Sequence, residues 1–101
     1  IGKVVFRGLV KGTVKIVNNS NDLINKNITR RDIIVSEKVN PDLFSLLSKA
    51  GGLITVDGGV TSHIAIQARQ HRIPTIQGVE GATRLLHDGD RIELDAKRLK
   101  I

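Results

Sequence analysis

The sequence has no cysteine, methionine, tryptophan or tyrosine, and it has only two phenylalanines among 101 residues. Without cysteine the chain can form neither a disulfide nor a thiolate zinc site, and we expect a reducing, cytoplasmic location. No apolar run approaches the roughly 18 residues that a membrane-spanning helix needs. The first residues also lack the charged and apolar regions of a signal peptide.

The scarcity of aromatic residues limits what the positive charge can mean. The formal net charge is +6, which is compatible with nucleic-acid binding. With two phenylalanines and no tyrosine or tryptophan, however, the chain lacks the side chains on which bases stack. A basic nucleic-acid-binding domain is therefore the weaker alternative, because docking on an acidic partner surface would use the same charge.

The length fits one domain. The first residue is Ile1 and the chain has no methionine. We therefore expect residues 1–101 to be a domain excised from a larger multidomain protein.

The pattern of apolar and turn-forming residues predicts a mixed α/β domain. We expect strands at 3–6, 13–17, 33–35, 53–56, 74–76 and 91–94, because these runs are rich in β-branched residues or alternate in polarity. Helices are expected at 41–50, 62–71 and 82–86. Gly8 and Gly12 are read as breaks between the first two strands, and 18–31 as a polar surface excursion. This order predicts a single compact domain with its site at the carboxyl end of a strand.

The most informative stretch runs Gly58-Gly59-Val60-Thr61-Ser62-His63. Two glycines let backbone amides approach a ligand closely, and Thr61 or Ser62 can cap the following helix. His63 would lie in the first turn of that helix, where the positive end of the dipole keeps the imidazole neutral and nucleophilic. The same field favours a phosphoryl dianion attached to the ring.

Other interpretations of these residues stay open at this point. A glycine pair and a Ser/Thr cap are common structural punctuation before a helix. Arg69 can reach a phosphoryl group or face solvent, and Asp57 can orient a ring or form a turn. No metal site is predicted, because His63, His71 and His87 lack the spacing of metal ligands and no cysteine joins them.

The stretch 58–63, followed by Ala65-Ile66, Ala68-Arg69, Ile73-Pro74 and Gly78-Val79, resembles the phosphohistidine swivelling domain of phosphoenolpyruvate-utilising enzymes. That family includes pyruvate phosphate dikinase, phosphoenolpyruvate synthase and enzyme I of the sugar phosphotransferase system. The resemblance covers residues 32–95 well and the first 31 loosely. It implies a swivelling β/β/α fold that shuttles a phosphoryl group between two active sites.

The resemblance also implies which residues and partners take part. His63 would be phosphorylated, with Gly58, Gly59, Thr61, Ser62 and Arg69 supporting the phosphate. This domain would bind no cofactor itself. Mg²⁺ and ATP or phosphoenolpyruvate would be held by nucleotide-binding and/or phosphoenolpyruvate/pyruvate-binding partner domains. A non-catalytic docking or regulatory relative is the alternative.

The chain departs from the family pattern at several positions. Val39 stands where the family often has threonine, so a hydroxyl that could orient the histidine ring is absent. Ala96 and Leu99 replace glycines near the C-terminus. Arg72 stands where the family usually has glycine at a helix end, and a left-handed conformation there would cost about 1 kcal/mol.

Overall fold

The computed structural model of the chain describes residues 3–17, 27–37, 48–57 and 62–96. The elements are β1 (Lys3–Phe6), β2 (Leu9–Ile16), β3 (Asp32–Ser36), β4 (Gly52–Thr55), α3 (Ser62–His71), β5 (Thr75–Gln77), α4 (Ala82–Leu85) and β6 (Arg91–Asp95).

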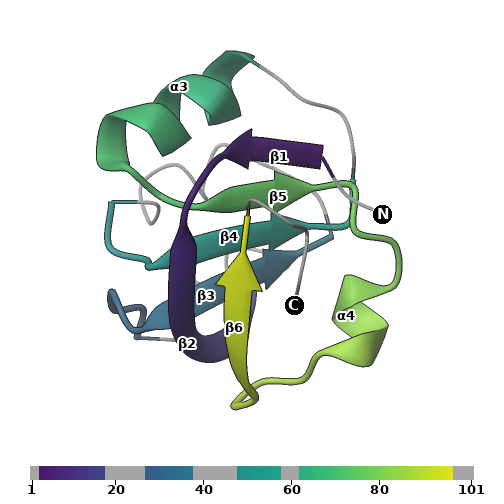
Figure 1. The fold of residues 1–101 in the computed structure, drawn as a ribbon. Helices are drawn as coiled ribbons and strands as arrows, with labels where there is room; N and C mark the ends of the chain where they lie inside the picture. The colour runs from purple at the N-terminus through teal and green to yellow at the C-terminus, as the bar shows by residue number, and fades with distance from the viewer. Residues whose placement is uncertain (1–2, 18–26, 38–47, 58–61, 97–101) are drawn as a thin grey trace.

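The strands form one sheet in the order β1-β5-β4-β3-β2-β6. The pairs β2–β3, β3–β4 and β4–β5 are parallel, whereas the edge strands β1 and β6 pair antiparallel with β5 and β2. Only residues 7 and 8 join β1 to β2, although four strand pairings separate these two strands in the sheet. The sheet therefore curls, and β2 and β6 cross in front of the central strands (Figure 1).

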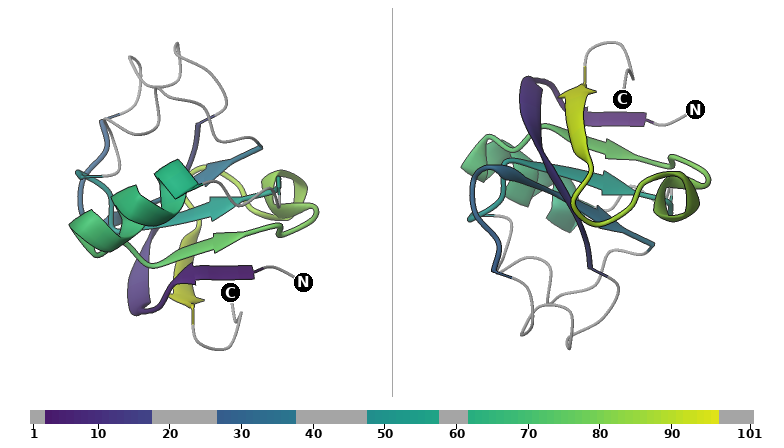
Figure 2. Two further views of the ribbon diagram at one scale, coloured as in Figure 1. Left: turned by 90° about the horizontal axis from the view of Figure 1, so that it is seen from above. Right: turned by 90° about the horizontal axis from the view of Figure 1, so that it is seen from below.

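The curl gives the central strands an inner and an outer face. On the inner face, β2 and β6 lie close enough to β4 that a Cβ at Gly52 would be 3.0 Å from Leu94 Cδ2 and 3.2 Å from Val10 Cγ1. Helix α3 covers the outer face, so the helix and the β2–β6 pair lie on opposite sides of the sheet (Figure 2).

Each face has its own apolar cluster, because successive strand residues point to opposite faces. The inner cluster comprises Val14, Ile33, Val35, Ile54, Ile76, Ala82, Leu94 and Ala96. The outer cluster comprises Val17, Ile28, Ile34, Ala50, Leu53, Ile64 and Ile73. Within β3, Ile33 and Val35 belong to the inner cluster while Ile34 belongs to the outer one.

Helix α3 ends in a Schellman motif. The Ile73 N–H donates to the Ala68 carbonyl at 2.9 Å, and the Arg72 N–H donates to the Arg69 carbonyl at 3.3 Å. Arg72 has a φ of 55°, so a non-glycine residue occupies the left-handed position of the motif. This confirms the conformation that its place at the helix end predicts.

The mixed α/β fold and most element positions are confirmed. Helix α3 has the predicted bounds, and β3, β4, β5, β6 and α4 lie within two residues of their predictions.

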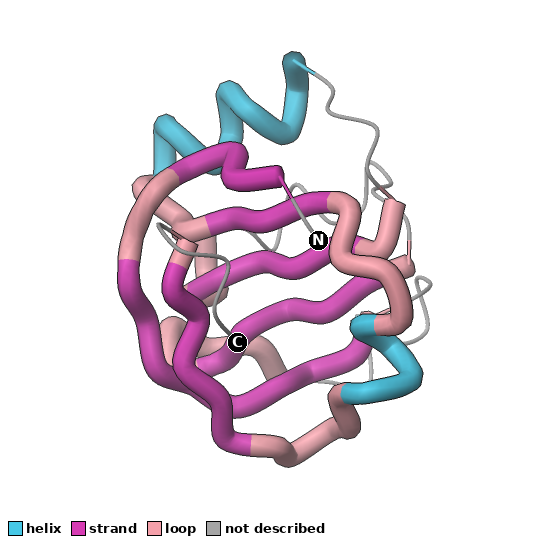
Figure 3. Tube along the Cα trace, turned by 45° about the vertical axis from the view of Figure 1, so that its right-hand side comes forward, coloured by secondary structure: helices cyan, strands magenta, loops and turns pink. Residues whose placement is uncertain are grey.

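In the part of the chain that the structure describes, no helix has the length and apolar character to span a bilayer. The tube in Figure 3 shows α3 and α4 at separate sides of the sheet.

One prediction is wrong: Gly12 does not break the chain between two strands. Strand β2 starts at Leu9 and runs through Gly12, pairing first with β6 and then with β3. Glycine is needed inside the strand because a Cβ there would lie 2.5 Å from the Arg31 carbonyl oxygen. The predicted helix at 41–50 falls mostly outside the described residues, as does most of the excursion at 18–31.

Candidate functional site

The candidate site lies where the parallel strands β3, β4 and β5 end. The strand β4 leads through Val56 and Asp57 to the predicted glycine turn, and α3 then begins at Ser62. Ser62 and His63 are thus the first two residues of a ten-residue helix, whose bounds agree with the range 62–71 predicted from the sequence. Gly58, Gly59 and Thr61 fall outside the described residues, as do the side chains of Ser62 and His63, so their predicted roles stay predictions.

Backbone hydrogen bonds anchor the segment that leads into the turn on both sides. The Val56 N–H donates to the Ser36 carbonyl at 2.9 Å, and the Asp57 N–H donates to the Glu37 carbonyl at 2.9 Å. From β5, the Gly78 N–H donates to the Asp57 carbonyl at 3.2 Å. Residue 57, which is exposed, is therefore tied through its main chain to the segments after β3 and β5.

The electrostatics of α3 suit an anion at its start. Its first turn carries no acidic residue, and Arg69 and His71 lie in its last turn. The N–H groups of a first helical turn have no partner within the helix, and the helix dipole makes that end positive. A phosphoryl group attached near the start of α3 would be stabilised by both effects.

Arg69 lies in an exposed groove on the side of α3. Arg69, Ala65, Val5, Phe6 and Arg7 line this cavity of about 380 Å³ between α3 and β1. Arg69 is six positions after His63, so the helix rise sets their Cα atoms about 9 Å apart along the axis. Arg69 therefore lines the same groove as Arg7, a residue that the sequence pattern did not single out.

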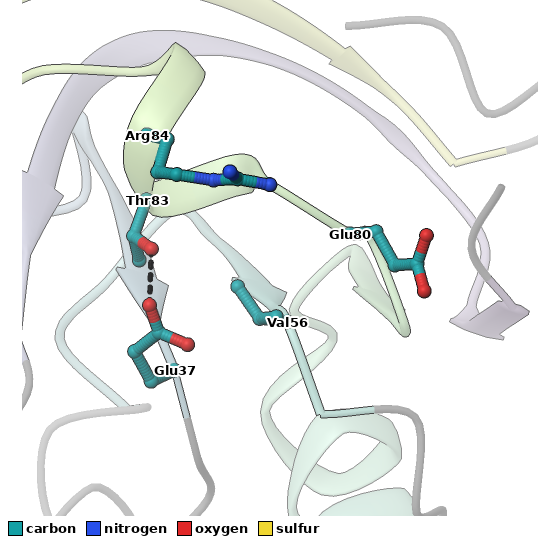
Figure 4. Close-up of a pocket in the computed structure, with 6 residues that line it drawn as sticks. Glu37, Val56, Glu80, Thr83 and Arg84 are labelled. Atoms are coloured by element: carbon teal, nitrogen blue, oxygen red, sulfur yellow. Dashed lines mark hydrogen bonds between the residues drawn. The ribbon is translucent and has the colours of Figure 1, made fainter.

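A second cavity of about 380 Å³ opens at the carboxyl ends of β3 and β4, beside α4. It is lined by Glu37, Val56, Glu80, Gly81, Thr83 and Arg84. Figure 4 shows Glu37 and Thr83 pointing toward each other, with a hydrogen bond from the Thr83 hydroxyl to the Glu37 carboxylate. Sequence reasoning missed this group, because its members follow three different strands and carry no motif.

The remaining histidines lie away from the start of α3. His71 is half-buried at the other end of the helix, and His87 is exposed near Asp90, with Nδ1 3.8 Å from Oδ2. Among the residues that can be described, no three His, Cys, Asp or Glu side chains gather to hold a metal ion.

Comparison with known proteins identifies relatives over almost the whole chain. The family model for the mobile domain of PEP-utilising enzymes matches residues 28–99. A pyruvate kinase of Staphylococcus haemolyticus is 39% identical over 99% of this chain. A rifampicin phosphotransferase of Bacillus cereus is 35% identical over 93%, and a probable phosphoenolpyruvate synthase of Methanothermobacter thermautotrophicus is 36% identical over 90%.

The chain spans only a small part of these proteins: 17%, 10% and 13% of their respective lengths. Among solved structures, the solution structure of a UPF0107 protein is similar with a TM-score of 0.78 and 14% identity, over 97% of this chain and 92% of that one. An Enzyme I structure has a TM-score of 0.62 and 24% identity, over 75% of this chain and 31% of that one. These structural likenesses support the same fold.

Proposed function

Since the chain belongs to the family of PEP-utilising enzyme mobile domains, we propose that it is a phosphoryl carrier whose His63 shuttles the group between two active sites. The observation that carries the proposal is the position of His63 as the second residue of α3, at the carboxyl ends of the parallel strands. A carrier histidine needs a stabilised anion and access for two partners, and a helix start at a sheet edge suits both needs.

The chemistry is transfer of a phosphoryl group to and from nitrogen. The Nε2 lone pair of neutral His63 attacks phosphorus, the P–Nε2 bond forms, and the bond from phosphorus to the donor oxygen breaks. The donor oxygen keeps the electron pair, and delivery to the acceptor reverses these changes. Thr61, Ser62 and the amides of Gly58 and Gly59 would support the phosphoryl oxygens, with Arg69 as a further cation.

The partners would be other domains of a larger phosphotransferase of the phosphoenolpyruvate synthase or pyruvate phosphate dikinase type. The curated relatives are six to ten times longer than this chain, which leaves room for such domains. Nucleotide-binding and phosphoenolpyruvate- or pyruvate-binding domains would hold ATP or phosphoenolpyruvate together with Mg²⁺. This domain would then supply the histidine and the motion.

The test is radiolabel transfer in the full-length protein, with labelled ATP and labelled phosphoenolpyruvate offered separately. We expect label on the protein that is labile to acid and stable to base, as a phosphoramidate is. His63→Ala should abolish labelling, whereas His87→Ala should leave it intact because His87 is exposed and lies between α4 and β6.

Two outcomes would contradict the proposal. Label that persists in His63→Ala would place the chemistry on another residue, and a protein that takes no label from either donor would fit a docking or regulatory relative.

Thr61→Val should slow transfer without abolishing it, since one supporting hydroxyl is lost and the nucleophile remains. The 101-residue chain with ATP alone should take no label.

A further inference from the structure

The outer face of the sheet differs from the inner face in the polarity of its buried side chains. Among the described residues, five polar side chains are buried: Asp32, Ser36, Thr55, Thr75 and Gln77. Ile33, Val35, Ile54 and Ile76, which alternate with them along β3, β4 and β5, belong to the inner cluster. The alternation of strand side chains therefore places all five on the outer face, which α3 covers.

Three of these residues form a polar row across the carboxyl ends of the strands. Ser36 on β3 is paired in register with Thr55 on β4. Ile54 is paired with Ile76, so Thr55 lies beside Gln77 on β5. The three residues are each 0% exposed. The polar row Ser36–Thr55–Gln77 thus ends, on the β5 side, in the largest of its side chains.

Among the described residues, Gln77 differs from the other four buried polar residues in its hydrogen bonding. Asp32 accepts the Thr29 N–H at 2.8 Å, the Thr55 hydroxyl donates to the Asp57 carbonyl at 2.8 Å, and the Thr75 hydroxyl donates to the Ile73 carbonyl at 2.8 Å. Neither Oε1 nor Nε2 of Gln77 has a partner among the described residues.

An unpaired buried amide destabilises a fold, and an apolar side chain of the same shape would fill the place without that loss. A buried polar group without a partner in a native structure therefore indicates that the residue has a role other than stabilising the fold.

The position of Gln77 relative to the start of α3 indicates what this role is. The two residues after it donate backbone hydrogen bonds to β4 and its exit: Val79 N–H to the Thr55 carbonyl at 3.0 Å, and Gly78 N–H to the Asp57 carbonyl at 3.2 Å. Helix α3 begins at Ser62, five residues after Asp57, and Ile64 packs in the outer cluster that lies on the same face as Gln77. The unpaired amide thus lies on the α3 side of the sheet, at the end where the helix that carries His63 begins.

We propose that Gln77 is a positioning residue for His63, with its amide oxygen accepting the Nδ1–H of the imidazole. This inference rests on the proposed function. A neutral imidazole carries its proton on one nitrogen, and an acceptor at Nδ1 keeps the proton there. The lone pair then stays on Nε2, which is the nitrogen that attacks phosphorus. The amide oxygen keeps its partner during transfer, because the ring that attacks through Nε2 still carries its proton on Nδ1 and becomes positively charged as the P–Nε2 bond forms.

The tautomer of His63 tests this directly. The chain has three histidines, so ¹⁵N-histidine spectra of the 101-residue chain contain few signals, and His71→Asn and His87→Asn assign them. We expect His63 to be protonated on Nδ1 in the unsubstituted chain and to become a mixture of tautomers in Gln77→Met. Gln77→Met should not lower the thermal midpoint, because it also removes the amide Nε2, a buried donor with no partner among the described residues.

In the full-length protein, Gln77→Met should slow labelling of His63 about tenfold, the loss expected for one hydrogen bond to a group that becomes charged. Gln70→Met is the matched control, because Gln70 is exposed on α3, and it should change neither tautomer nor rate. Gln77→Leu serves as a second apolar variant if methionine packs poorly.

A thermal midpoint that falls in both apolar variants, with the tautomer unchanged, would overturn the inference and make Gln77 a structural residue. An unchanged tautomer with an unchanged labelling rate would overturn it as well. The proposed function fails separately, through label that persists in His63→Ala, and the tautomer measurement remains decisive for Gln77 in that case.

Discussion

The two faces of the central strands show different tolerances for polar side chains. The inner face is closed by β2 and β6, and its buried described residues are apolar. The outer face is covered by α3 and admits five buried polar residues, four of which have hydrogen-bond or other partners. The inner face therefore contributes mainly to stability, whereas the outer face combines packing with a polar row beside the start of α3.

The strongest test of this contrast uses two neighbouring residues of β4. Ile54→Thr places a hydroxyl in the inner cluster and removes apolar volume, so we expect the free energy of unfolding to fall by about 3 kcal/mol. Thr55→Val, on the outer face, removes one hydrogen bond to the Asp57 carbonyl, which still accepts from Gly78. We expect that change to cost under about 1 kcal/mol, because Thr55 loses only its own donor.

Urea unfolding of both variants measures the difference, since the midpoint and slope together give the free energy of unfolding. Equal losses in the two variants would show that the faces do not differ in this way. A changed slope in Ile54→Thr alone would instead indicate that the compactness of one state has changed.

A second test asks how tightly the inner face is closed. Gly52→Ala adds a methyl group 3.0 Å from Leu94 Cδ2 and 3.2 Å from Val10 Cγ1, both on the strands that cross β4. Those side chains must move, and we expect a loss of about 1.5 kcal/mol in the free energy of unfolding. Leu94→Val shortens the side chain that is nearest.

The double variant Gly52→Ala/Leu94→Val should therefore be more stable than the sum of the two single effects predicts, by at least about 0.5 kcal/mol. If the two changes in the free energy of unfolding were strictly additive in the same urea measurements, the methyl group at residue 52 would not be in contact with Leu94 on β6. The double-mutant cycle isolates this contact because it subtracts what each change does elsewhere.

The contrast between the faces could be predicted from the sequence only in part. The run Ile33-Ile34-Val35 correctly indicated a buried strand, but a strand that is buried on both faces shows no polar alternation. Nothing in the run distinguishes the residue of the outer cluster from the two of the inner one. The prediction that Gly12 breaks the chain between two strands was wrong because the reason for glycine there is not local. The carbonyl of Arg31, which leaves no room for a Cβ, comes from a distant part of the chain.

The candidate site could also be predicted from the sequence only in part. The predicted start of α3 is confirmed, with His63 in the first turn, because the signals for a helix start are local in sequence. The polar row was not predictable, because Ser36, Thr55 and Gln77 belong to three strands and only the sheet register brings them together. The groove between Arg7 and Arg69 likewise depends on the packing of α3 near β1.

The smallest expected effect concerns the end of the helix that covers the outer face. Arg72 has a φ of 55° at the left-handed position of the Schellman motif, where a Cβ is unfavourable. Arg72→Gly should relieve this strain, but glycine also gains entropy in the unfolded chain. We expect a net gain of about 0.5 kcal/mol, seen as a rise of roughly 2–4 °C in the thermal midpoint. Arg72→Ala is the matched control, since alanine removes the exposed positive charge and keeps the Cβ. If alanine stabilised the chain as much as glycine does, the cause would be the charge of Arg72. A gain confined to glycine would show instead that the backbone at the end of α3 is strained, and that the outer layer, unlike the inner face, can still be stabilised by one local change.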